Sequence, residues 1–133
     1  MRALARDSLS NMPDSPHPSG AAPPAWEGVR ELHPAVLASR LASGDALTVV
    51  DVRETWEWSR VHLEGAQHIP LGDFTTATAS LDPRGEVVLV CHHGMRSLAA
   101  ARYLVQCGFE RVWNLSGGID RYAAEVDPSL PRY

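Results

Sequence analysis

Short apolar runs alternate with segments of helical periodicity along most of this chain. The runs are rich in Val, Leu and Ile, as buried strands are. The segments between them place apolar residues three or four positions apart, which is the spacing of a helix face. Strands are therefore expected over residues 29–32, 47–51, 67–69, 86–90 and 112–115, and helices over 34–43, 54–59, 72–81 and 94–107.

This alternation predicts an α/β fold in which a parallel sheet is covered by helices on both faces. The helical pattern is weakest over 72–81, where Thr75, Thr76 and Thr78 lower the helix propensity. Ligands of such sheets bind beyond the carboxyl ends of the strands, so candidate chemistry is sought there.

The first 25 residues differ from the rest, because Pro and small residues crowd positions 11–24. Such a segment buries too little apolar surface to offset the entropy of ordering it. We therefore expect residues 1–25 to form a disordered Pro-rich tail and residues 26–133 to form one domain.

Composition narrows the possible partners. The 133 residues carry a net charge of −4, which gives no electrostatic case for binding nucleic acid. All 12 basic residues are Arg, so Schiff-base and Walker-type lysine chemistry are excluded. No apolar run could span a bilayer, and the N-terminus lacks the apolar core of a signal peptide. A cytoplasmic protein without membrane contact is the expectation.

The most informative chemical feature is Cys91, which directly follows the predicted strand 86–90. A loop containing Gly94 comes next and leads into the predicted helix 94–107. This arrangement gathers backbone N–H groups and the positive end of a helix dipole around one sulfur. Such a setting favours the thiolate, which is the reactive form of cysteine. A buried structural cysteine is the alternative, but the polar loop favours a functional one.

Four segments together resemble the rhodanese-like sulfurtransferases: residues 49–58, 62–71, 91–97 and 112–120. The resemblance covers about residues 29–133 and departs at Val61, where the family usually has Gly, a residue that tolerates positive φ. It implies the rhodanese-like fold, a parallel five-stranded sheet with helices on both faces. It also implies that Cys91 carries a sulfur atom as a persulfide, without a cofactor.

The loop after Cys91 is the predicted substrate-binding site, since its N–H groups would stabilise an anionic sulfur. Arg96 either binds an anionic donor or pairs with a surface carboxylate. The two histidines are expected to line the pocket mouth, and no metal site is expected because neighbouring residues rarely bind one ion. The predicted loop residues are His92, His93, Gly94, Met95, Arg96 and Ser97.

Further predictions concern residues outside the loop. The resemblance implies that Asp51 and Arg53 brace the active-site region, although an ordinary surface ion pair remains an alternative. Cys107 falls on the apolar face of its helix and is expected to be a small core residue rather than a resolving thiol. The tryptophans are expected in the core or at the pocket rim, namely Trp56, Trp58 and Trp113.

Three functions stay open. The first is a single-domain sulfurtransferase that moves sulfur from a small donor such as thiosulfate to a thiol or cyanide, with a sulfur-relay protein as a further partner. The second is a Cys-dependent phosphatase or arsenate reductase, which the four residues between Cys91 and Arg96 disfavour because a phosphate cradle needs a longer loop. The third is a non-enzymatic interaction module, which the presence of the cysteine disfavours.

Overall fold

The computed structural model describes residues 28–133. The predicted tail, residues 1–25, lies outside the described residues. The strands are β2 (Val29–Leu32), β3 (Leu47–Asp51), β4 (Gln67–His68), β5 (Glu86–Val90) and β6 (Arg111–Leu115). They form a five-stranded sheet in the order β2-β6-β5-β3-β4, and every neighbouring pair is parallel. The predicted strands and their parallel pairing are confirmed.

Five α-helices connect and cover the strands: α1 (Pro34–Ala42), α2 (Thr55–Arg60), α3 (Phe74–Ala77), α4 (Met95–Gln106) and α5 (Gly118–Glu125). The weakly helical stretch is broken, since 3-10 turns at Leu71–Asp73 and Thr78–Ser80 flank the single turn of α3. Helix α5 was not predicted, because Gly117 and Gly118 read as a turn. Both do have positive φ, of 75° and 67°, and the helix begins within that turn.

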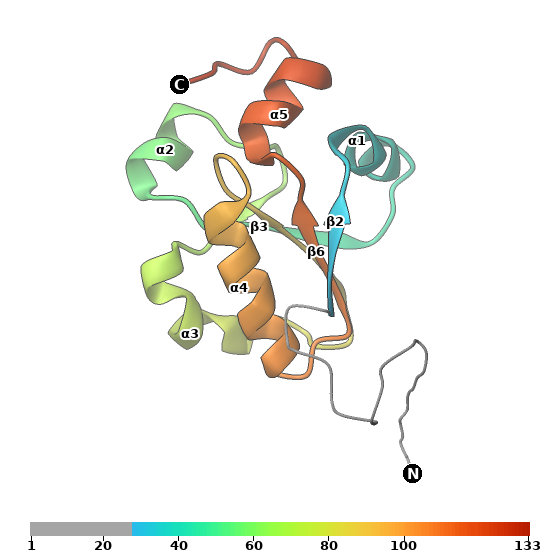
Figure 1. Ribbon diagram of the computed structural model, residues 1–133, viewed down its shortest axis with the longest axis vertical. Coiled ribbons are helices and arrows are strands. Elements are labelled where there is room, and N and C mark those ends of the chain that lie inside the picture. Colours follow the sequence, from blue (N-terminus) through green and yellow to red (C-terminus); the bar gives the residue numbers. More distant parts are fainter. Residues whose placement is uncertain (1–27) are drawn as a thin grey trace, which may run out of the picture.

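Helices cover both faces of the sheet, as expected (Figure 1). Side chains alternate along β5, so Val87 and Leu89 pack in one core with α3 and α4, while Val88 and Val90 pack in the other with α1 and α5. Cys91 continues the first series and belongs to the core on the α4 side. The sheet therefore directs the Cys91 side chain toward the start of α4.

One prediction about burial is wrong. Cys107 is exposed, because it is the C-cap of α4 and lies beyond the last turn that packs on the sheet. Trp56 is 61% exposed on α2 and lies outside the core, which leaves the other predicted position, at the pocket rim. Trp58 and Trp113 are half-buried, and Trp58 stacks on the ring of His62 at 3.7 Å. Within residues 28–133, no helix has the length and apolarity that crossing a membrane requires.

Candidate active site

Cys91 lies at the carboxyl end of β5 with no exposed surface. Its carbonyl oxygen accepts a hydrogen bond of 2.9 Å from the backbone N–H of Ile119, at the start of α5. The residue is thus held by its strand and by the following βα unit. Its side chain is covered by neighbouring atoms of the site.

Two groups donate hydrogen bonds to the sulfur. The backbone N–H of Gly94 lies 3.0 Å from Sγ, and the hydroxyl of Ser97 lies 3.2 Å from it. Gly94 has a φ of 101°, which few other residues adopt, and it is the N-cap of α4. The positive φ turns the loop so that the sulfur faces the N-terminus of α4, where the helix dipole favours negative charge.

Asn114 on β6 supports this arrangement, and sequence reasoning missed it. Its Oδ1 accepts a 2.5 Å hydrogen bond from Ser97, while its Nδ2 donates to the carbonyl of Gly94 at 3.1 Å and to Glu31 at 3.0 Å. A hydroxyl has one hydrogen, so Asn114 and the sulfur compete for that of Ser97. The sequence did contain a signal for this role, because Asn114 is a polar residue in the otherwise buried second half of β6.

The start of α5 fixes the other side of the loop. A Cβ at Gly118 would overlap the carbonyl group of His92 and lie 2.6 Å from the carbonyl oxygen of Cys91. The N–H of Asp120 donates to the carbonyl of His92 at 3.1 Å. The absence of a side chain at Gly118 therefore allows close contact between α5 and the loop after Cys91.

Arg96 makes an ion pair with Glu57 of α2. Its two terminal nitrogens lie 2.6 and 2.9 Å from the two carboxylate oxygens, in a bidentate arrangement. The Arg96 hydrogen bonds outweigh burial and lower the pKa of Glu57 to about 2. The carboxylate is only 3% exposed, so Arg96 pairs with a buried acid rather than with a surface one. Glu57 was not singled out from the sequence, where it looked like any other polar helix residue.

Asp51 and Arg53 form a buried pair below the loop, with exposed fractions of 1% and 0%. The guanidinium binds both carboxylate oxygens, at distances from 2.7 to 3.0 Å, and also donates to the carbonyl oxygen of Val61. The alternative of a surface ion pair is wrong. The backbone of Val61 has a φ of −164°, an extended value open to any residue, so Val in place of the usual Gly causes no strain here.

Tyr133 joins these two ion pairs. Its hydroxyl accepts a 2.7 Å hydrogen bond from Arg53 and donates one of 2.8 Å to Glu57. Its ring stacks on His92 of the loop, with centroids 4.0 Å apart and planes 9° from parallel. Burial outweighs the opposing hydrogen bond from Arg53 and, with the contact to Glu57, raises the pKa of Tyr133 to about 12, so the hydroxyl stays protonated at neutral pH. The segment after α5 runs back toward α2 (Figure 1).

The remaining loop side chains are those of His92, His93 and Met95. Burial, followed by repulsion from His93, lowers the pKa of His92 and favours its neutral form. His93 and Met95 have exposed side chains and make no hydrogen bond to the sulfur among residues 28–133. Of the six predicted loop residues, Gly94 and Ser97 therefore contact Sγ directly, and the guanidinium of Arg96 is held by Glu57.

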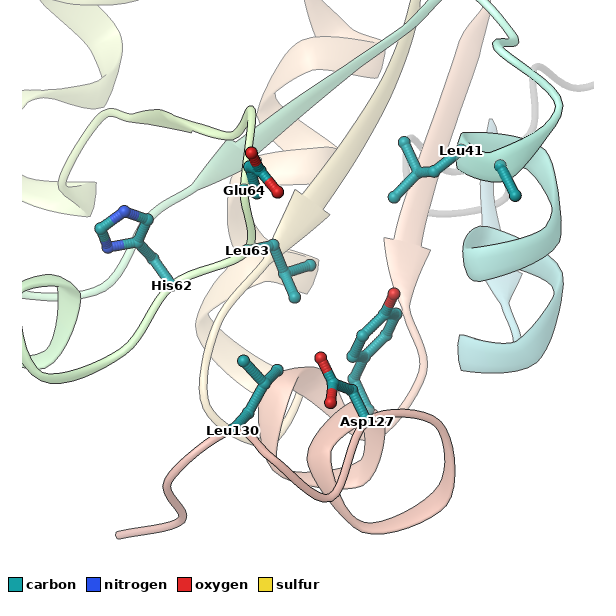
Figure 2. Close-up of a pocket in the computed structure, with 8 residues that line it drawn as sticks. Leu41, His62, Leu63, Glu64, Asp127 and Leu130 are labelled. Carbon is teal, nitrogen blue, oxygen red and sulfur yellow. The ribbon is translucent and has the colours of Figure 1, made fainter.

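A separate hollow lies between α1, α5 and the loop before β4 (Figure 2). Leu41, Leu63, Glu64 and Leu130 are among its lining residues. No residue of the Cys91 loop lines it, and none of its lining residues is a cysteine. The chemistry that the sequence predicts therefore belongs to the Cys91 loop and not to this hollow.

The chain combines a parallel α/β sheet with a cysteine loop at the carboxyl end of its central strand, β5. Comparison with known proteins finds a family with this description. The model of the Rhodanese-like domain matches residues 33–125. The chain therefore belongs to the rhodanese-like family.

Relatives of this chain differ in length. It is 40% identical over 85 residues to the thiosulfate sulfurtransferase GlpE of Pseudomonas fluorescens, covering 59% of this chain and 75% of that protein. It is 38% identical over 93 residues to the chloroplastic Rhodanese-like/PpiC domain-containing protein 12 of Arabidopsis thaliana. That match covers 67% of this chain and 31% of the plant protein, so the chain spans about a third of this relative's length.

Solved structures of rhodanese-like proteins also resemble this chain. The rhodanese-related protein of Thermoplasma volcanium superposes with a TM-score of 0.66 at 30% identity, covering 73% of this chain and 93% of that one. A rhodanese-like domain protein of Staphylococcus aureus gives a TM-score of 0.68 at 23% identity, covering 78% and 98%, which is a likeness of fold.

Proposed function

We propose that this chain is a sulfurtransferase in which Cys91 carries the transferred sulfur. The Cys91 thiolate attacks the outer sulfur of thiosulfate, the new S–S bond forms, and sulfite leaves with the electron pair of the broken S–S bond. The charge of the product persulfide lies on its terminal sulfur. A thiolate or cyanide then attacks that sulfur and restores the Cys91 thiolate.

The observation that carries this proposal is the pair of donors on Sγ, from Gly94 at 3.0 Å and Ser97 at 3.2 Å. Donors fixed around a developing anion stabilise it without reorganisation. In the proposed roles, Gly94 and Ser97 bind the anionic sulfur, while the Asp51–Arg53 pair braces the loop from below. His92, His93 and Met95 line the entrance.

Phosphatase chemistry fits the same residues less well. A phosphoryl group presents three equatorial oxygens, each needing donors. Here four residues separate Cys91 from Arg96, and both terminal nitrogens of Arg96 bind Glu57. A short loop with an occupied arginine suits one sulfur atom better than a tetrahedral oxyanion.

A protein partner is part of the proposal. "Probable adenylyltransferase/sulfurtransferase MoeZ" of Mycobacterium tuberculosis is 36% identical over 102 residues, which make up 26% of its length. A rhodanese-like unit within a longer chain suggests that sulfur passes between protein groups. We extend this to the present chain as a sulfur-relay role, in which the acceptor is a thiol on another protein.

Mass spectrometry after incubation with thiosulfate tests the function. The peptide that contains Cys91 should gain one sulfur atom and lose it again with cyanide or dithiothreitol, while the Cys107 peptide stays unmodified. Cys91→Ser should abolish the gain and thiocyanate formation. Full turnover by Cys91→Ser, or Cys91-dependent hydrolysis of p-nitrophenyl phosphate, would contradict the proposal.

A further inference from the structure

Charge is balanced around the active-site loop. Three arginines lie in or beside the site, and each is paired with its own carboxylate at 3.0 Å or less. The pairs are Arg53 with Asp51, Arg96 with Glu57, and Arg132 with Asp120. The site therefore has hydrogen-bonding groups for an incoming sulfur donor, but it carries little net positive charge.

Among these cations, Arg96 is the one placed to meet a donor. It lies within the loop and its side chain is 36% exposed, whereas Arg53 is fully buried below. Glu57 is 3% exposed and binds the guanidinium with both oxygens, so its negative charge faces Arg96 rather than solvent. Tyr133 holds the same carboxylate in place through a 2.8 Å hydrogen bond.

Two large apolar side chains are exposed on the elements that carry this ion pair. The ring of Trp56 is 61% exposed and lies 5.7 Å from the ring of Tyr133, whose hydroxyl binds Glu57. Met95 begins α4 and is 76% exposed. Exposed large apolar side chains next to a neutralised cation favour an organic group over a fully charged one. The entrance thus combines low net charge with apolar surface.

We propose that Glu57 sets the donor selectivity of this site: by neutralising Arg96 it disfavours dianionic donors and favours sulfane donors that carry one charge and an organic group. The inference rests on the function proposed above and names the substrate class within it. Organic persulfides and thiosulfonates belong to that class. With a persulfide donor, the Cys91 thiolate takes the outer sulfur and an organic thiolate leaves, so atoms and charge balance.

Two small donors isolate the effect. Thiosulfate and methanethiosulfonate present the same sulfane sulfur, but the second has a methyl group in place of one charged oxygen. Glu57→Gln removes the countercharge with little change in shape. It also preserves the helix cap, since Gln can replace Glu at this position of a capping box. The measured quantity is kcat/KM for each donor at saturating cyanide.

In Glu57→Gln, we expect the ratio of kcat/KM for thiosulfate to that for methanethiosulfonate to rise by about two- to fivefold, the size of one partly exposed charge interaction. A merely structural role of Glu57 would lower both values and leave the ratio unchanged, and that result would overturn the inference. Glu86→Gln is the matched control. Glu86 also binds an arginine, Arg40, with both oxygens at 2.7 and 2.8 Å, at the other end of β5. Its removal should leave the ratio as in the wild type.

A second measurement needs no variant. With the wild-type protein, kcat/KM for thiosulfate should not fall as KCl is raised, because Arg53, Arg96 and Arg132 are each already paired with a carboxylate. A steep fall would overturn the inference even if Glu57→Gln did not fold. If neither donor modifies Cys91, the sulfurtransferase function itself fails. If sulfur is transferred but Glu57→Gln leaves the donor ratio unchanged, only the proposed role of Glu57 is contradicted, and the sulfurtransferase function stands.

Discussion

The carbonyl group of His92 lies so close to the Cα of Gly118 that any side chain at position 118 would overlap it. The loop after Cys91 and the start of α5 are thus in direct backbone contact. This relationship joins the loop after β5 to the turn after β6, and it requires Gly on the α5 side.

Gly118→Ala should therefore be more destabilising than an ordinary substitution at positive φ. A left-handed backbone costs a non-glycine residue about 1–2 kcal/mol, and forced overpacking adds about 1–3 kcal/mol. Gly44→Ala is the control, since Gly44 has a φ of 76° and no atom within 4 Å of an added Cβ. Urea denaturation would measure the free energy of unfolding of both variants. Equal decreases would show that the loop after Cys91 moves away from the new side chain at no energetic cost.

Ser97→Ala should slow persulfide formation on Cys91 by about tenfold or more. The hydroxyl lies 3.2 Å from Sγ, and a hydrogen bond to a charged group contributes about 1.5–3 kcal/mol. Quenched mass spectrometry after mixing with thiosulfate gives the rate. Ser80→Ala is the control, because that hydroxyl donates to the carbonyl of Ala77 instead. An unchanged rate in Ser97→Ala would assign the stabilisation to backbone groups.

Tyr133→Phe should lower the free energy of unfolding by about 1–3 kcal/mol, because it removes a hydrogen bond to each of two charged groups. Phenylalanine keeps the ring that stacks on His92. Tyr122→Phe is a suitable comparison, since the Tyr122 hydroxyl makes no side-chain hydrogen bond within the described part of the chain and its removal should cost about 0.5 kcal/mol or less. Thermal or chemical denaturation distinguishes the two.

The Glu57–Arg96 pair should make stability depend on acid pH. The pKa of Glu57 is lowered to about 2 in the folded protein from 4.5, so its contribution is fully present above pH 4.5 and is lost as the pH falls toward 2. The difference in unfolding free energy between wild type and Glu57→Gln should shrink over that range. Urea titrations at several pH values measure it, and a difference that stays constant to pH 2 would contradict the role of the ion pair.

Cys107→Ala should leave both stability and turnover close to wild type. The residue is exposed at the end of α4, so the substitution should change the unfolding free energy by about 0.5 kcal/mol or less. Denaturation curves and thiocyanate formation are the measurements. Loss of turnover in a folded Cys107→Ala protein would reveal a second thiol in the reaction.

Much of the fold and the centre of the site could be read from the sequence. Residues 47–51 and 86–90 form strands as predicted, because consecutive β-branched and apolar residues favour a strand buried on both faces. The position of Cys91 after β5 and the turn at Gly94 are also local features. They follow from residues that adjoin one another in the chain.

The contacts that complete the site were not predictable in this way. Arg96 and Glu57 are 39 positions apart, and Glu57 and Tyr133 are 76 apart, so nothing in the local pattern links them. The exposure of Cys107 likewise depends on where α4 stops packing on the sheet.

Sequence alone determined the strands, the cysteine loop and its helix, because hydrophobic periodicity and backbone conformation act between near neighbours. The tertiary structure decided which charges meet. The sheet order β2-β6-β5-β3-β4 brings the ends of distant strands to one edge, and burial there makes each ionic side chain pair with another.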